Sequence, residues 1–466
     1  MVFSSITFLF FFLPIVIIIY FTVPYKVKNI ILLMASLLFY FCGEPKLVFL
    51  FIFSILMNYM FGILIERCNQ LVLRKVVTGC AISINIILIG LFKYADFAIK
   101  NINSLFSMDI PLLKLALPVG ISFYTFQAIS YLIDVYRGEV KAQKNIINIS
   151  LYISLFPQLI AGPIVRYQTV NNELSKRTHS FADFSYGTRR FIFGLSKKLL
   201  IADQIANLWT LSTQANQPSV LYYWLGAIAF TMQIYFDFSG YSDMAIGMGR
   251  MFGFHFLENF DHPFCAKSIT EFWRRWHISL GSWFRDYLYI PLGGKRNGKL
   301  RWIFNLFVVW GLTGFWHGAD WNFVLWGLLF GIVLMLEKLF FLKMLDKIPA
   351  FFSHIYTILI VVFSFVLFNN SIADAAVFMK SMIGITNIPF ISAESLYYLH
   401  NYLGVLVISI VFSTDIPSII LRKMTINPTF NKIADYIEPV LLIIMLLISV
   451  GYMVDSSFQP FLYFRF

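Results

Sequence analysis

Residues 302–336 read WIFNLFVVWGLTGFWHGADWNFVLWGLLFGIVLML, an apolar run of 35 residues whose only ionisable groups are His317 and Asp320. As one straight helix this run would be about 52 Å long, whereas the hydrocarbon core of a bilayer is ~30 Å thick. The run therefore predicts two elements, or one strongly tilted and broken helix. The break is expected at Gly314, Gly318 and the Ala-Asp-Trp sequence. His317 then lies at or near irregular backbone, which membrane proteins tolerate where it is buried in protein or lines a water-filled cavity.

The rest of the chain has the composition of a membrane protein. Of its 466 residues, 59% are hydrophobic and 13% are charged, whereas soluble domains carry about 25% charge. Lipid admits only helices and closed barrels as spanning structures, and the apolar runs here are continuous rather than alternating, which favours helices. The sequence predicts an all-α polytopic membrane protein that forms a single membrane-embedded domain over residues 1–466. Spans are expected near residues 3–23, 29–42, 46–66, 76–93, 117–136, 147–165, 220–238, 302–316, 322–342, 354–368, 396–413 and 436–454.

Polar segments between these runs indicate which parts of the chain lie in loops or at the membrane surface. The longest, roughly residues 166–190, is expected to be a loop. Residues 187–206 place four basic side chains among apolar ones, which predicts either a basic amphipathic helix in the headgroup plane or an ordinary connector. The formal net charge of +12 is gathered in short loops and interfacial segments, which indicates contact with anionic membrane lipids and argues against nucleic acid. The four cysteines are scattered without a C-x-x-C pair, so no metal site is indicated.

Residues 270–294, TEFWRRWHISLGSWFRDYLYIPLGG, gather Arg, His, Trp and Asp side chains within a chain that is otherwise mostly hydrocarbon. Read as one helix over 271–288, the segment places His277 on the apolar face, toward protein or lipid. It is too polar to span and too apolar for a loop, so a re-entrant or interfacial helix is expected. His277 is either a core histidine bonded to a carbonyl or part of a site. The arginines are either interfacial anchors or a site that attracts an anionic donor; they are Arg274, Arg275 and Arg285.

His317 is the sharper candidate for chemistry, since it lies in the middle of an apolar run. A neutral imidazole can take a proton from a hydroxyl, as acyl transfer from a thioester to an alcohol requires. A structural role is the alternative. Asp320, three residues on, would approach the same face if the helix continued. Asp237 and Asp243 lie just past another apolar span, where they either act in a channel or bond to Arg or backbone groups at a helix end.

At these residues the chain resembles the membrane-bound O-acyltransferase family, in its bacterial branch of alginate and peptidoglycan O-acetyltransferases. The resemblance rests on six blocks that occur in order and together cover essentially the whole chain. They are residues 118–127, PVGISFYTFQ; 156–163, FPQLIAGP; 233–247; 271–294; 314–318, GFWHG; and 460–466, PFLYFRF. Two departures are Gly281, where serine is expected, and Arg465, where glutamine is expected.

The resemblance implies a ring of about 11–13 helices around a central channel, with re-entrant or interfacial helices and a core at residues 116–345. It makes His317 the active-site histidine and His277 a second, supporting one. Trp273, Trp276 and Trp316 are expected to shape a water-poor pocket. No bound cofactor is implied, and acetyl-CoA is the expected thioester donor. An extracytoplasmic acyltransferase partner protein is expected to carry the acyl group to a glycan, from a multi-pass protein in the bacterial cytoplasmic (inner) membrane.

The function predicted in this way is O-acyl transfer from a cytoplasmic thioester donor, across the membrane, to an extracytoplasmic polysaccharide of the alginate or peptidoglycan type. Two alternatives stay open at this point. One is a proton-coupled transporter or channel in which the same histidines relay protons. The other is a lipid or protein O-acyltransferase of the same family.

Overall fold

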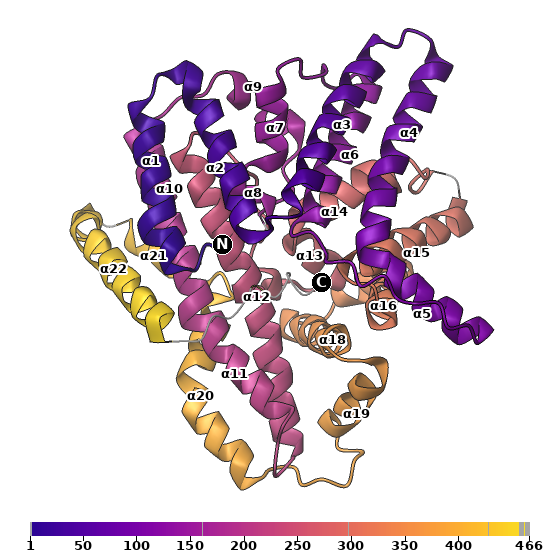
Figure 1. Ribbon diagram of the computed structural model, residues 1–466. Coiled ribbons are helices and arrows are strands. Elements are labelled where there is room, and N and C mark those ends of the chain that lie inside the picture. The colour runs from indigo at the N-terminus through magenta and orange to yellow at the C-terminus, as the bar shows by residue number, and fades with distance from the viewer. Residues whose placement is uncertain (1, 161, 297, 427, 456–460, 462–466) are drawn as a thin grey trace. The chain divides into compact units, whose positions relative to one another are not determined.

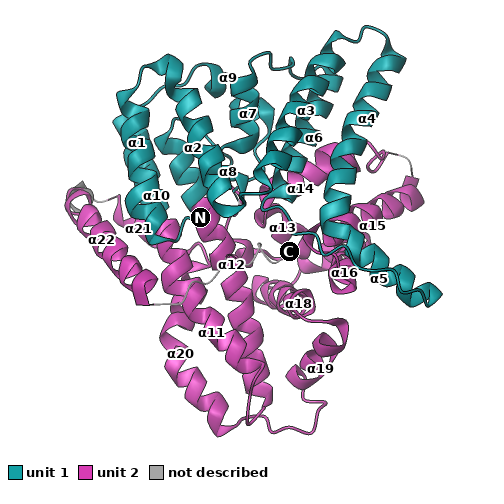
Figure 2. Ribbon diagram, in the orientation of Figure 1, with its two compact units in different colours: residues 1–191, 244–257 teal, residues 192–243, 258–466 magenta. Residues whose placement is uncertain are grey.

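The computed structural model describes the chain except residues 1, 161, 297, 427, 456–460 and 462–466, and the side chains of 428–431. Throughout the described ranges the regular structure is helical, without a strand (Figure 1). The chain divides into two compact units, residues 1–191 with 244–257, and residues 192–243 with 258–466 (Figure 2). The all-α prediction is confirmed. The single domain over 1–466, the core at 116–345 and the ring around a central channel stay predictions.

The first unit holds α1 (Leu13–Thr22), α2 (Lys28–Gly43), α3 (Val48–Arg67), α4 (Leu71–Ile89), α5 (Ala95–Phe106), α6 (Ile121–Arg137), α7 (Ile146–Ser154), α8 (Phe156–Leu159), α9 (Tyr167–Ser175) and the start of α10 (Phe181–Ser196). Helices α2 and α3 are separated between Gly43 and Val48, where the predicted spans at 29–42 and 46–66 are also separate. The predicted span at 147–165 is wrong, because Leu155 and Pro157 divide it into two short helices. The predicted loop at 166–190 is also wrong, since α9 and the first turns of α10 form there.

The second unit holds η4 (Lys197–Ala202), α11 (Asp203–Ser212), most of α12 (Val220–Met251), α13 (Ile269–Arg275), α14 (Ile278–Phe284), η6 (Arg285–Tyr289), α15 (Gly298–His317), α16 (Trp321–Leu336), η7 (Glu337–Phe341), α17 (Leu342–Leu345), α18 (Ala350–Asn369), α19 (Ile372–Met382), α20 (Ala393–Phe412), α21 (Ile416–Met424) and α22 (Pro428–Asp455). The η elements named here are π-helical turns.

Within the described residues, seven helical stretches are long and apolar enough to cross a bilayer: Tyr25–Gly43, Val48–Arg67, Leu71–Phe106, Trp321–Leu345, Ala350–Asn369, Ala393–Phe412 and Lys432–Asp455. The chain is therefore a multi-pass membrane protein. Helices α1, α6, α12 and α15 fall on predicted spans but are not among the seven. Helix α6 is short, at 17 residues; it is buried on nearly all sides and carries polar side chains such as Gln127 and Asp134 inside the protein.

The apolar run at 302–336 is broken where its length predicts. Helix α15 ends at His317, and α16 begins at Trp321 after a three-residue turn. Two glycines let the helices touch backbone to backbone: a Cβ on Gly314 would overlap the Phe323 carbonyl oxygen, and one on Gly327 would overlap that of Trp310. Side chains would hold the helices apart, so this close crossing fixes the end of α15, and with it His317.

Residues 187–206 do not form one basic amphipathic helix. The chain passes from α10 through η4 into α11, and Lys198 is buried in η4. Its ammonium lies 2.8 Å from Asp237 on α12 and 2.7 Å from Asp203, while Lys197 lies 2.6 Å from Asp243. A Cβ at Gly240, midway between the two α12 aspartates, would lie 2.7 Å from the Gly194 carbonyl oxygen. The close approach at Gly240 brings the lysines to those carboxylates instead of to lipid headgroups.

Candidate active site

The polar segment at 271–288 is not one helix, because it breaks at His277. Helix α13 ends with the Trp276 amide bonded to Phe272, and α14 begins at Ile278. His277 itself takes the left-handed conformation, with φ 45° and ψ 53°. Such a backbone is uncommon outside glycine, and histidine is among the residues enriched there. The continuous helix expected over 271–288 therefore does not exist, and residues before and after His277 face different neighbours.

His277 is enclosed by protein, in agreement with its predicted position on the apolar face of the segment. It is 1% exposed. Its ring meets Phe238 edge-on at 4.6 Å between centroids and lies 6.1 Å from the Trp316 ring. Its Nδ1 is 3.1 Å from the amide oxygen of Asn259. Burial lowers the pKa of His277, which lies outside the seven spanning helices, to about 3, so the imidazole is neutral at physiological pH.

His317, the last residue of α15, is 3% exposed and surrounded by aromatic rings. Ring centroids of Trp316, Trp326 and Phe368 lie 4.9, 5.1 and 5.4 Å from its own. Trp316 thus contacts both imidazoles. The structure brings the two predicted histidines close to the same indole ring.

A cavity of about 480 Å³ opens on His277. Its wall is built from α13, α14, η6, α15, α16 and η7. Of the predicted residues, Trp273, Arg274 and Arg285 line it; the others that do are Thr270, Ile278, Leu280, Gly281, Ser282, Phe284, Tyr289, Leu306, Val309, Trp310, Thr313, Leu334 and Lys338. Trp276 and Trp316 are buried behind this described lining, Trp276 against Phe260 and Phe272.

A second cavity, of about 430 Å³, shares Arg274, Tyr289 and Lys338 with the first. It adds Lys295 and Arg296 to the shared cations, along with Ile290, Gly293 and Gly294. Of the described residues that line either cavity, none is acidic. The two cavities adjoin at these shared residues, so four cations lie close to a cavity that has a neutral imidazole in its wall. Such a pair of cavities suits a ligand with an anionic end and a neutral end.

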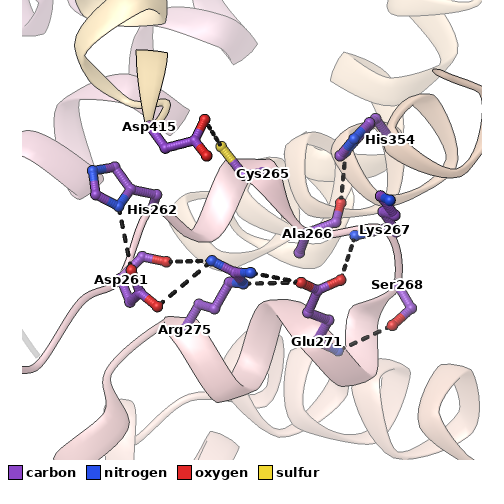
Figure 3. A network of polar contacts seen from close by, with 10 residues as sticks. All are labelled: Asp261, His262, Cys265, Ala266, Lys267, Ser268, Glu271, Arg275, His354 and Asp415. Carbon is purple, nitrogen blue, oxygen red and sulfur yellow. Dashed lines mark hydrogen bonds and ion pairs between the residues drawn. The ribbon is translucent and has the colours of Figure 1, made fainter. Parts of the chain in front are cut away.

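Arg275 was predicted as a channel residue, but its guanidinium forms a structural clamp (Figure 3). It bonds Glu271 at 2.9–3.0 Å and the Asp261 carbonyl oxygen at 3.2 Å. The Asp261 amide in turn donates to the Arg275 carbonyl oxygen at 2.9 Å. The clamp fixes the segment around Asp261 against the end of α13.

Three predicted carboxylates also lie in structural contacts. Asp237 and Asp243 pair with the lysines described above, where the sequence suggested Arg or backbone partners at a helix end. Helix α12 in fact continues past both. Asp320 is exposed and caps α16 by accepting the Trp321 amide at 2.6 Å, so it does not extend α15 alongside His317.

The sequence reasoning missed Asn259, Lys338 and Tyr289 as residues of this site. Asn259 lies in an irregular stretch without a motif. Lys338 follows the apolar run at 302–336 and reads as an ordinary end-of-span cation, so only its place in both cavities distinguishes it.

The sequence of this chain matches those of known proteins. The family model of the membrane-bound O-acyltransferases matches residues 139–382, a range that contains both histidines and every residue lining the two cavities. The chain belongs to the membrane-bound O-acyltransferase family. It is therefore a membrane-bound O-acyltransferase, as its sequence predicts.

Relatives from several bacteria extend the match. A probable alginate O-acetylase AlgI of Azotobacter vinelandii is 40% identical over 383 residues, covering 81% of this chain and 76% of the relative. Another, from Pseudomonas syringae pv. tomato, is 44% identical over 345 residues, covering 72% and 66%. A peptidoglycan O-acetyltransferase of Helicobacter pylori is 30% identical, covering 100% of this chain and 98% of the relative.

Of the two departures from the membrane-bound O-acyltransferase pattern, Gly281 lies within the described residues. Gly281 lines the first cavity, and a Cβ there would meet only the Trp273 carbonyl oxygen, at 3.7 Å, so the position has room for the expected serine. Arg465 lies outside the described residues, as does the block at 460–466 apart from Phe461. The Phe461 ring stacks on Tyr241 at 4.8 Å and approaches Phe238 at 5.8 Å.

Proposed function

We propose that this acyltransferase moves an acetyl group from cytoplasmic acetyl-CoA, across the membrane, to hydroxyl groups of an extracytoplasmic polysaccharide of the alginate or peptidoglycan type. The observation that carries the proposal is the cavity that has a neutral histidine in its wall and cations in its own lining and in that of the adjoining cavity. The names of the relatives support acetyl as the group and polysaccharide as the acceptor.

The cations that line the cavities support acetyl-CoA as the acyl donor. Acetyl-CoA carries its phosphates at one end and its thioester at the other. The phosphates would bind where Arg274, Lys338, Lys295 and Arg296 supply charge-assisted hydrogen bonds. The uncharged pantetheine arm and the thioester would then extend toward Trp273 and His277.

The chemical step requires one proton transfer. A hydroxyl oxygen attacks the thioester carbonyl carbon, the carbon–sulfur bond breaks, and the hydroxyl proton passes to an imidazole that returns it to the thiolate. We assign this base, or the equivalent acyl relay, to His317. His277 orients the reactants or relays the proton. The aromatic rings around both exclude water, which protects the acyl group from hydrolysis.

Final delivery to the glycan would use a second, extracytoplasmic acyltransferase protein that receives the acetyl group. This arrangement places the protein in the bacterial cytoplasmic membrane, with these cations on the side where acetyl-CoA is made.

The test is transfer of label from radiolabelled acetyl-CoA into envelope glycan by membranes that contain the wild-type protein, His317→Ala or His354→Ala. His354, on α18, bonds a backbone carbonyl oxygen at 3.1 Å and is a matched histidine away from the cavity. Wild type and His354→Ala should transfer label, and His317→Ala should not, at equal protein abundance. Normal transfer by His317→Ala would refute the assignment. Proton flux that depends on His317, without transfer from any thioester, would favour a transporter instead.

A further inference from the structure

We propose that Asn259 is a positioning residue for His277: its amide oxygen holds the imidazole in the tautomer protonated at Nδ1, which makes Nε2 the nitrogen that accepts a proton. The inference rests on the proposed function, because it assigns a role within the same site. It concerns a residue 18 positions before His277 in the chain and adds a polar contact to the aromatic ring contacts that His277 makes with Phe238 and Trp316.

The orientation of the Asn259 amide follows from its partners. The side-chain oxygen lies 3.3 Å from the Ser279 backbone amide and 2.8 Å from the Ser279 hydroxyl. The side-chain nitrogen lies 3.1 Å from the Ser242 hydroxyl. A backbone N–H can only donate, so the atom that faces Ser279 must be the amide oxygen. That same oxygen lies 3.1 Å from His277 Nδ1.

This geometry selects one tautomer of His277. An amide oxygen has no proton to give, so a hydrogen bond to it requires the proton on Nδ1. A neutral imidazole with Nδ1 protonated carries its lone pair on Nε2. The low pKa of His277, caused by burial, keeps the ring neutral, so the lone pair is present throughout the physiological range. Without Asn259 the ring would divide between two tautomers, and only one of them has a base at Nε2.

Asn259 also holds the backbone on which the imidazole stands. Its carbonyl oxygen accepts the Ile278 amide at 3.0 Å, directly after the left-handed residue. The Arg275 clamp secures the neighbouring Asp261 on the other side of His277. Two backbone bonds thus bracket His277, while Asn259 fixes its ring. Strained backbone persists where its surroundings over-determine it, and such places concentrate at active sites.

The burial of Asn259 requires that its amide be hydrogen-bonded. Asn259 is 1% exposed, and a buried amide without partners carries a large desolvation cost. Its side-chain hydrogen bonds go to Ser242, Ser279 and His277, and together these partners specify one orientation of the amide.

The test is a double-mutant cycle in the acetyl-transfer assay, with Asn259→Ala, His277→Gly and the pair. Glycine is used because it accepts the left-handed backbone. Asn259→Ala should lower kcat about 10- to 100-fold, which is at or below the roughly 10²- to 10⁴-fold contribution of a positioned acid–base group, because the imidazole itself remains, with the KM for acetyl-CoA changed less than about two-fold. In the His277→Gly background the same change should lower kcat by less than about two-fold, since the ring it positions is gone.

Two further variants keep the proposal falsifiable. Asn259→Asp keeps an acceptor at Nδ1 and raises the pKa of the imidazole through its negative charge, so it should retain activity at high pH while the acid limb of the rate profile moves upward. Asn58 on α3, a fully buried amide bonded to Asn85 at 3.2 Å, is the matched control. Asn58→Ala should lower stability without lowering kcat per folded molecule.

Wild-type kcat in Asn259→Ala, an equal loss in both backgrounds, or an unmoved profile in Asn259→Asp would overturn the proposal. Unchanged kcat in His277→Gly would overturn it too, while leaving the proposed function standing on His317. Failure of the proposed function would look different, because the wild-type membranes themselves would then transfer no acetyl group.

Discussion

Replacing Lys198 by methionine should destabilise the protein strongly. The ammonium bridges Asp203 and Asp237, and the three side chains are only 5, 11 and 2% exposed. Burial disfavours the charged ammonium, but Asp237 and Asp203 outweigh it and raise the pKa of Lys198, so the cation is present at pH 7. Methionine preserves the length of the side chain and leaves two buried carboxylates without their counter-ion. Breaking a buried ion pair in this way costs about 3–5 kcal/mol.

The neighbouring lysine provides the matched control. Lys197 pairs with Asp243 at 2.6 Å, but this pair is more accessible, at 30 and 14% exposure. Lys197→Met should therefore cost roughly 1 kcal/mol or less. The assay is denaturant-induced unfolding of the detergent-purified protein, followed by tryptophan fluorescence. Asp237→Asn should recover part of the loss in Lys198→Met, because it removes one uncompensated charge. Equal losses for the two lysine variants, or a Lys198→Met loss below 1 kcal/mol, would refute the reasoning.

Three further predictions concern the site. Asp320→Ala should lower the free energy of unfolding by about 1 kcal/mol through loss of the α16 cap, with kcat per folded molecule unchanged; a collapse of kcat would instead tie Asp320 to the chemistry. Arg274→Ala should raise the KM for acetyl-CoA roughly 10-fold or more, with weaker salt dependence, whereas unchanged KM would place the phosphates elsewhere. The pKa of His277 lies near 3 in the folded protein and about 6.5 in the unfolded chain, so the unfolded state takes up the proton first as pH falls. Stability should therefore decline from about pH 6.5 downward, and His277→Asn should lose less stability than wild type between pH 7 and 4.5. Equal losses of stability in His277→Asn and wild type would contradict a His277 pKa lowered by burial.

Features governed by length and burial were predictable from the sequence. The break after His317 follows from comparing an apolar run with the thickness of a bilayer, and no tertiary information is needed. The burial of His277 among aromatic rings follows from the apolar residues around it. The interruption between the predicted spans at 29–42 and 46–66 falls at Gly43 and Pro45, where backbone chemistry alone disfavours a helix.

Features governed by a distant partner were not predictable. The helix break at His277 depends on Asn259 and Asp261, which bond the backbone on either side of it, and helical periodicity cannot register such partners. Lys198 looked like a headgroup contact because a charge count does not show which carboxylate lies opposite. Only the close packing at Gly240 brings Asp237 within reach.

The contact between Gly314 and Gly327 has a consequence for how this protein tolerates change. Neither residue has a reactive group, yet any larger side chain at either one must push α15 and α16 apart and carry the end of α15 with it. A mutational scan scored only by lost activity would rank these two glycines beside His317. Scoring abundance as well as activity would separate them, since a glycine variant should fail at assembly and a histidine variant at turnover. Substitutions along this helical hairpin can therefore be harmful for two different reasons. At the glycines they prevent the helices from packing, and at His317 they prevent turnover.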